Sequence, residues 1–195
     1  MKDLLIKRFL YYKNLGDQTF KSLNDHDITW KFNEESNSIA TIVKHVSGNM
    51  LSRWTNFLTE DGEKDWRKRD QEFENDIRSK SEMLELWKKG WAVLNVALEQ
   101  LTDENLQATI LIRGEKHSVL DALLRQLAHY PYHIGQIIYI AKMLQNENWE
   151  TLSIARNKSA EFNKEMLASK SLDQNENASP VCFEKSDEVR KDYRN

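Results

Sequence analysis

Apolar residues recur three and four positions apart along four long stretches of this 195-residue chain. That spacing places them on one face of an α-helix, so each stretch predicts an amphipathic helix with a buried side. Ser38 and Ser118 precede the second and fourth stretches, where a serine hydroxyl can cap a helix by accepting from a backbone N–H. We expect the four helices at about residues 2–23, 38–57, 80–101 and 118–144.

The connections between these helices differ in length and character. Residues 59–78 are dense in charge, and we expect a long exposed crossover there, with Trp66 and Phe73 as its anchors on the bundle. The apolar run at residues 108–112, followed by a turn that contains glycine, predicts a short hairpin before the fourth helix. The sequence therefore predicts an all-α fold, a four-helix bundle with a long crossover connection.

The composition is that of a water-soluble globular protein, with 39% hydrophobic and 30% charged residues. A chain of this length suffices for one domain with a substantial core. We expect the bundle over residues 1–168. Because residues 169–195 are mostly polar, we expect a flexible tail there.

The distribution of charge argues against nucleic-acid and membrane partners. The formal net charge is −3, and Lys and Arg alternate with Asp and Glu along the chain. Nucleic-acid binding needs clustered positive charge instead. No stretch approaches the ~20 apolar residues that cross a bilayer, and the N-terminus lacks a signal-peptide core. The single cysteine, Cys182, excludes an intramolecular disulfide and fits a reducing compartment, so we expect a cytoplasmic protein.

Three histidines are candidate ligands of a metal ion. His129 and His133 stand four residues apart, which places both rings on one helical face and within reach of one ion. The alternative for such a pair is two half-buried histidines that bond to carbonyl groups. His45, beside the apolar stripe of another helix, favours the metal site. Three neutral histidines would leave the ion its full charge and an open coordination position, as in a reactive site.

Further polar residues accompany the histidines at helical spacing. Asn49 and Arg53 follow His45 at successive steps of four, and Gln136 lies three residues after His133. Their functional interpretation is orientation of a ligand or binding of a substrate, with Arg53 attracting an anionic group. The alternative is that the amides satisfy internal polar atoms and that Arg53 forms an ordinary salt bridge.

Two motifs resemble the DinB-like (YfiT-like) superfamily of metal-binding four-helix bundles, and in particular one bacterial branch of it. The first comprises NSIATIVKH at residues 37–45 and GNMLSRW at residues 48–54, and the second is QLAHYPYHIGQI at residues 126–137. The resemblance covers about residues 1–165. One departure is SIARNKS at residues 153–159, where the branch commonly has proline and glycine in place of Ala155 and Asn157.

The resemblance implies a bundle, often dimeric, that holds a divalent metal ion, typically nickel or zinc, on three histidines. In this sequence these are His45, His129 and His133. Characterised relatives in the superfamily depend on low-molecular-weight thiols such as bacillithiol and mycothiol.

Two functional hypotheses follow for this chain. The first is a metal-dependent transferase that activates a bacillithiol-type thiol for attack on an electrophilic small molecule. This hypothesis rests largely on the resemblance, and a shared fold is weak evidence of activity. The second is a non-catalytic, stress-associated bundle protein in which a structural metal ion joins the second and fourth helices.

Overall fold

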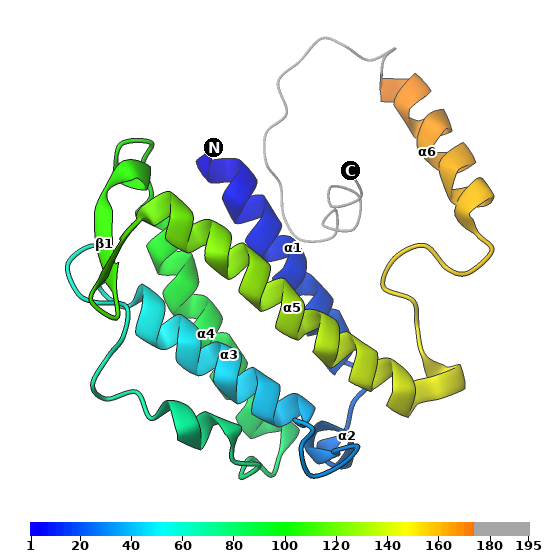
Figure 1. The fold of residues 1–195 in the computed structure, drawn as a ribbon. Coiled ribbons are helices and arrows are strands. Elements are labelled where there is room, and N and C mark those ends of the chain that lie inside the picture. The colour runs from blue at the N-terminus through cyan, green and yellow to red at the C-terminus, as the bar shows by residue number, and fades with distance from the viewer. Residues whose placement is uncertain (174–195) are drawn as a thin grey trace. The chain divides into compact units, whose positions relative to one another are not determined.

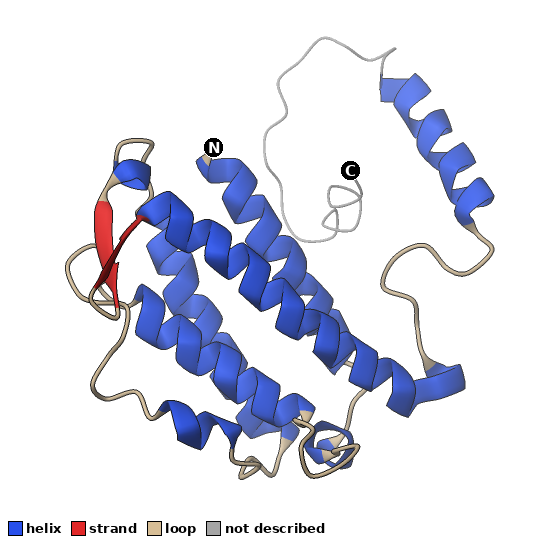
Figure 2. Ribbon diagram, in the orientation of Figure 1, coloured by secondary structure: helices blue, strands red, loops and turns tan. Residues whose placement is uncertain are grey.

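The computed structural model describes residues 1–173, which fall into two compact units divided after Trp149. The first unit is predominantly helical and carries one small antiparallel sheet, as Figures 1 and 2 show. The predicted all-α bundle is confirmed. The elements of the first unit are α1 (Lys2–Phe20), α2 (Asp25–Thr29), α3 (Ile39–Trp54), η1 (Arg69–Phe73), α4 (Lys80–Glu99), η2 (Asn105–Gln107), β1 (Thr109–Ile112), β2 (Glu115–Ser118), α5 (Val119–Gln145) and η3 (Asn146–Asn148).

Four helices, α1, α3, α4 and α5, pack in a closed ring. Helix α3 lies between α4 and α5, and α1 contacts α5 and α4 from the other side. Both α3 and α4 begin near α2, where the Lys80 backbone N–H donates to Asp25 Oδ1 at 2.7 Å. These two helices therefore run in the same direction. The chain achieves this through residues 55–79, the crossover, which returns it along the length of the bundle (Figure 1).

The predicted caps set the starts of the helices that carry the candidate ligands. Ser38 Oγ accepts from the Thr41 backbone N–H at 3.1 Å, and Ser118 Oγ accepts from that of Asp121 at 3.0 Å. The Asp121 carboxylate accepts from His117 Nδ1 at 2.7 Å. These bonds satisfy backbone donors that a helix start leaves unpaired, so α3 and α5 begin where the sequence predicts.

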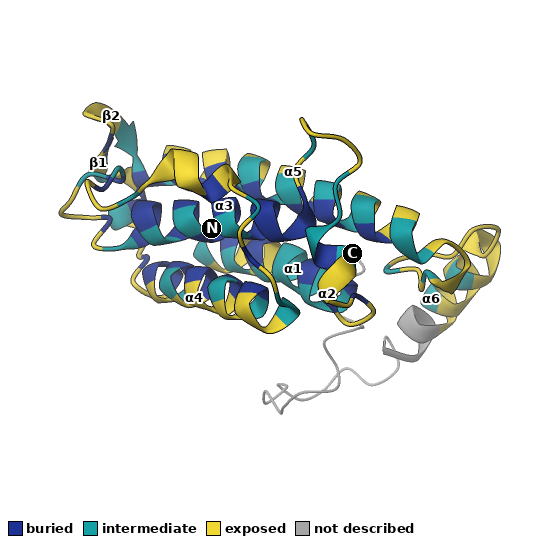
Figure 3. Ribbon diagram, turned by 90° about the horizontal axis from the view of Figure 1, so that it is seen from below, coloured by how far each residue is buried: buried dark blue, intermediate teal, exposed yellow. Residues whose placement is uncertain are grey.

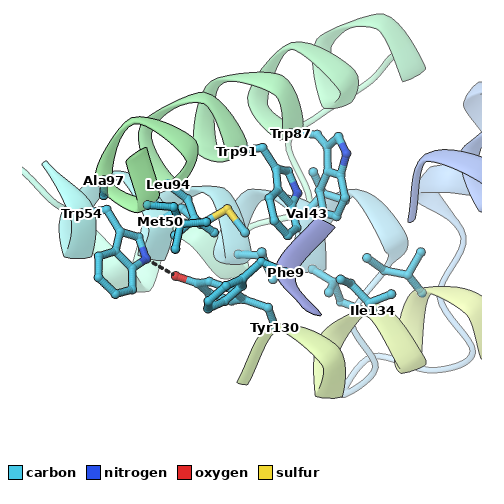
Figure 4. Close-up of a cluster of buried hydrophobic side chains, with 14 of the residues drawn as sticks. Phe9, Val43, Met50, Trp54, Trp87, Trp91, Leu94, Ala97, Tyr130 and Ile134 are labelled. Atoms are coloured by element: carbon cyan, nitrogen blue, oxygen red, sulfur yellow. Dashed lines mark hydrogen bonds between the residues drawn. The ribbon is translucent and has the colours of Figure 1, made fainter. Parts of the chain in front are cut away.

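Helix α3 is the most enclosed helix of the bundle. Most of its residues are buried, as the dark segments of α3 in Figure 3 show. Polar residues on this helix therefore face protein rather than water. Near the C-terminal end of α3, Trp54 Nε1 donates to the hydroxyl of Tyr130, a residue of α5, at 3.0 Å (Figure 4). That hydroxyl donates to Asn49 Oδ1 at 3.0 Å.

We expect the Tyr130 hydroxyl to contribute to stability through its two hydrogen bonds. The Tyr130→Phe variant leaves the donor of Trp54 and the acceptor of Asn49 unpaired in the core, which costs about 1–3 kcal/mol. We expect that loss in the free energy of unfolding measured in urea. Tyr132→Phe is the matched control, because this neighbouring tyrosine on α5 is 62% exposed. Equal stability of the two variants would contradict the expectation.

The hairpin before α5 is present and is attached to the crossover. Strands β1 and β2 pair with Ile112 opposite Glu115, and the two turn residues, Arg113 and Gly114, both have positive φ angles of 57° and 77°. A two-residue turn of this kind matches the twist of the strands. The Asp61 carboxylate accepts from the backbone N–H groups of both turn residues, at 2.8 and 2.7 Å, which joins the start of the crossover to the hairpin.

The crossover differs in part from its prediction. Trp66 is 56% exposed, so it does not anchor the segment, and Phe73 is 37% exposed. Two charged residues, Lys64 and Glu72, are buried instead. Each has an opposite charge within hydrogen-bond distance, which offsets the cost of burial.

In the second unit the structure describes residues 150–173, with α6 at Ser159–Asp173. Asn157 has a φ of 66°, the left-handed region that glycine favours and asparagine tolerates, so Asn157 can stand where the resemblance implies glycine. Of the predicted tail at residues 169–195, the first five residues continue α6 and the others lie outside the described residues. Within residues 1–173, no helix has the length and apolar character needed to span a membrane.

Candidate metal centre

The three predicted histidines meet between α3 and α5. His45 projects from α3, and His129 and His133 project from adjacent turns of α5. His129 Nε2 lies 3.4 Å from His45 Nε2 and 3.1 Å from His133 Nε2, and one nitrogen from each ring lies within 4.8 Å of the others. His45 is buried and the other two are half-buried, so this group of side chains can hold a metal ion and is reachable from solvent on the α5 side.

Each ring is also held through its other nitrogen. A carboxylate or an amide oxygen can only accept, so each Nδ1 atom carries a proton and each Nε2 atom keeps a free lone pair. Such partners fix the tautomer and the orientation of a metal-binding imidazole. The three pairs are His45 Nδ1 with Glu72 Oε2 at 2.9 Å, His129 Nδ1 with Gln126 Oε1 at 3.1 Å, and His133 Nδ1 with Gln136 Oε1 at 3.0 Å.

The donor set fits a divalent transition-metal ion. Imidazole binds zinc at about 2.0–2.1 Å, and a tetrahedral arrangement then requires nitrogens about 3.3 Å apart. The two short Nε2–Nε2 distances, 3.4 and 3.1 Å, match this requirement. Three lone pairs that converge without a donor between them repel one another, and a shared cation removes the repulsion. The geometry is thus that of ligands arranged for an ion.

Glu72 is a member of this site that the sequence did not reveal. It belongs to the crossover, far from both helices along the chain, and its carboxylate accepts from His45 and from Arg67 Nε and Nη2 at 2.8 and 2.9 Å. Gly48 permits the approach, because a Cβ atom there would collide with the Glu72 carboxylate. The Phe73 ring lies against His45, with ring centroids 4.9 Å apart. The crossover thereby completes the environment of His45.

The remaining predicted residues have separate positions. Gln136 contacts His133 directly, whereas Asn49 bonds to Tyr130 and Arg53 is buried against Gly62, two helical turns from His45. Gln126, which was not among the predicted residues, occupies the equivalent place beside His129. The signal that could have revealed it is its spacing, three residues before a histidine, which mirrors that of Gln136 after His133.

Comparison with known proteins places the chain in a family. A family model described as "Protein of unknown function (DUF1572)" matches residues 2–158. The chain belongs to this DinB-like family. The DUF1572 match spans α1 to α5 and so includes the three histidines and Glu72. No curated protein and no solved structure matches the chain.

Electrostatics keep the two α5 histidines of this DUF1572 family member neutral. Burial, together with the proximity of His133 and His45, lowers the pKa of His129 to about 3. Burial also lowers the pKa of His133, against the bond to Gln136. For Glu72, burial raises the pKa, but the bonds from His45 and Arg67 outweigh it and hold the pKa below its usual value. Neutral imidazoles and an ionised carboxylate are the forms that metal binding requires.

These shifts predict how the stability of the metal-free DUF1572 bundle depends on pH. Unfolded histidines titrate near pH 6.5, so below that pH the unfolded chain binds protons that folded His129 does not. Stability is complete above about pH 6.5 and declines as the pH falls towards about 3. With allowance for solvent screening, we expect a loss of about 2 kcal/mol between about pH 7 and pH 4.5 in urea unfolding. The His129→Gln variant should show a flatter profile, and an identical slope would contradict the assignment.

Proposed function

We propose that the chain binds a divalent metal ion, nickel or zinc, and activates a bacillithiol-type thiol for attack on an electrophilic small molecule. The observation that carries the proposal is the convergence of three Nε2 lone pairs whose Nδ1 atoms all donate to oxygen. Three neutral ligands leave a position for a substrate, which distinguishes a reactive site from a closed structural one. The thiol chemistry is that of the YfiT-like proteins, which the two sequence motifs resemble.

A divalent ion held by these residues supplies Lewis acidity, which makes a thiol acidic enough to act as a nucleophile near neutral pH. The chain's own residues orient the imidazole ligands and leave a path for the substrate. Glu72, Gln126 and Gln136 fix the three imidazole rings, so that the ligands need little rearrangement. His129 and His133 are half-buried, so a small molecule can approach from the α5 side, while the buried His45 and Phe73 close the crossover side.

Removal of the ion should leave the bundle folded. The apolar core extends along α1, α3, α4 and α5 and does not depend on the histidines. We therefore expect a chelator to preserve the helical circular dichroism spectrum and to lower the melting temperature by only about 5–10 °C. Loss of the helical spectrum would instead support a structural ion that joins α3 and α5.

The catalytic part of the proposal requires a direct assay. Metal-loaded protein incubated with bacillithiol and an epoxide should consume the thiol faster than the same mixture with the His129→Ala variant. In cobalt-substituted protein, the thiol should change the visible absorption spectrum. The absence of both turnover above background and a spectral change would exclude a thiol-activating enzyme.

A further inference from the structure

Arg53 is a buried cation with unpaired donors. It follows His45 and Asn49 on α3 at successive steps of four residues. The residue is 4% exposed, and its Nε and Nη1 atoms have no hydrogen-bond partner among residues 1–173. A guanidinium group offers five N–H donors, and burying them without acceptors is unfavourable. Such burial lowers the stability of the fold, and an anionic ligand would offset that loss.

The backbone of Gly62 lies against one side of the Arg53 side chain. A Cβ atom on Gly62 would lie 2.6 Å from Arg53 Nη1, so a larger residue there would force the guanidinium to shift. Gly62 is itself held by two bonds, its N–H to the Leu111 carbonyl at 2.8 Å and its carbonyl to Ser52 Oγ at 2.7 Å. These bonds hold the Gly62 backbone in place against the Arg53 guanidinium.

Two further arginines share the surroundings of Arg53 and of the metal centre. Burial lowers the pKa of Arg53, and nearby Arg125 and Arg67 lower it further, against the influence of Tyr130. The same two arginines lower the pKa of His129. Arg125 is exposed on α5 and Arg67 belongs to the crossover, so α5 and the crossover each contribute one cation near His129, while Arg53 lies two helical turns from His45 on α3.

The nearest carboxylates are engaged by other groups. Glu72 accepts from Arg67 and His45, and Glu63 Oε2 accepts from Arg113 Nε at 3.0 Å. Asp61 accepts from three backbone N–H groups. None of these three carboxylates accepts from Arg53 Nε or Nη1, so the guanidinium keeps donors for which the described residues supply no acceptor. A buried guanidinium in that state favours an anionic ligand over a neutral one.

We propose that Arg53, with Arg125 at the rim, forms a subsite for the carboxylate group of a substrate that reacts at the three-histidine centre. A guanidinium binds a carboxylate through two parallel hydrogen bonds, which supplies both affinity and orientation. Arg53 follows His45 by two helical turns, about 12 Å along the axis. The carboxylate is therefore separated from the reacting atom by a chain of several bonds. The inference rests on the proposed function, because it names the class of substrate for that site.

A matched pair of thiols tests the subsite in the cobalt-substituted protein. The probes are 6-mercaptohexanoate and the neutral 6-mercaptohexanol, titrated by visible absorption. We expect the wild-type protein to bind the carboxylate about tenfold more tightly, as one charge-assisted pair provides. Arg53→Gln should abolish this preference, and Arg8→Gln, an exposed arginine on α1, should retain it. Equal affinities for the two thiols in the wild-type protein would overturn the subsite, whether or not the Arg53 variant folds.

A second measurement separates this inference from the proposed function. Hexanoate lacks a thiol, and its binding to the metal-free protein can be followed by saturation-transfer NMR. Binding to the wild-type protein and not to Arg53→Gln would support the subsite even if no thiol altered the cobalt spectrum. A lack of hexanoate binding together with equal thiol affinities would overturn the subsite and leave thiol activation intact.

Discussion

Replacing His129 with Ala is expected to abolish stoichiometric metal binding. Its Nε2 atom is the one that lies close to both of the others, at 3.4 and 3.1 Å, so its loss leaves two ligands without their common neighbour. The dissociation constant should rise by more than the roughly 10–100-fold that loss of an outer partner costs. Elemental analysis of protein purified without chelator or histidine tag, then dialysed, measures the bound equivalents and also identifies the metal.

The matched control for this variant is His26→Ala, which removes an exposed histidine from α2. It should keep one equivalent of metal per chain. Circular dichroism should show both variants folded, because half-buried His129 belongs to the site and not to the apolar core. One equivalent of metal retained by the His129→Ala protein would eliminate the three-histidine site.

Glu72→Gln is expected to weaken metal binding by about 10–100-fold. Glutamine can still accept a hydrogen bond from His45, but it lacks the charge that makes the opposite ring nitrogen a better donor to a cation. It also leaves Arg67 without its bidentate partner. Competition with a chromogenic chelator measures the affinity. The control is Glu74→Gln, an exposed carboxylate in the same segment.

Gly48→Ala tests the same Glu72–His45 interaction without changing Glu72 itself. The added methyl group would occupy the position of the Glu72 carboxylate and displace it while leaving its charge in the chain. We expect the affinity to fall as in Glu72→Gln. Unchanged affinity in both variants would show that Glu72 has no influence on the centre.

Much of this fold follows from local signals. The four helices were predictable because apolar spacing and serine caps are properties of adjacent residues, and Ser38 and Ser118 begin α3 and α5 as expected. The hairpin was predictable from its glycine turn. The crossover was not, because its buried residues, Lys64 and Glu72, have the same character as the exposed charges around them. Only the pairing with distant groups distinguishes them.

The candidate site likewise contains residues that local sequence signals reveal and residues that only tertiary packing reveals. His129 and His133 share a helical face by spacing alone, and His45 was identifiable from its place beside an apolar stripe. That these rings meet depends on how α3 packs against α5, which no single helix specifies. Glu72 could not be found, since nothing in a charge-rich segment indicates which carboxylate folds back on His45. The Arg53 environment likewise depends on Gly62, a residue that as sequence indicates only a turn.

The bond between Glu72 and His45 makes the metal centre a cross-link between two helices and a connection of the chain. If an ion binds more tightly when the crossover is folded against α3, the ion must stabilise that fold by the same free energy. Local opening of residues 67–73 then becomes a route for release of the ion, faster than unfolding of the bundle. The lifetime of a bound ion would then depend on opening of the crossover, and the four helices could remain folded while the ion exchanges.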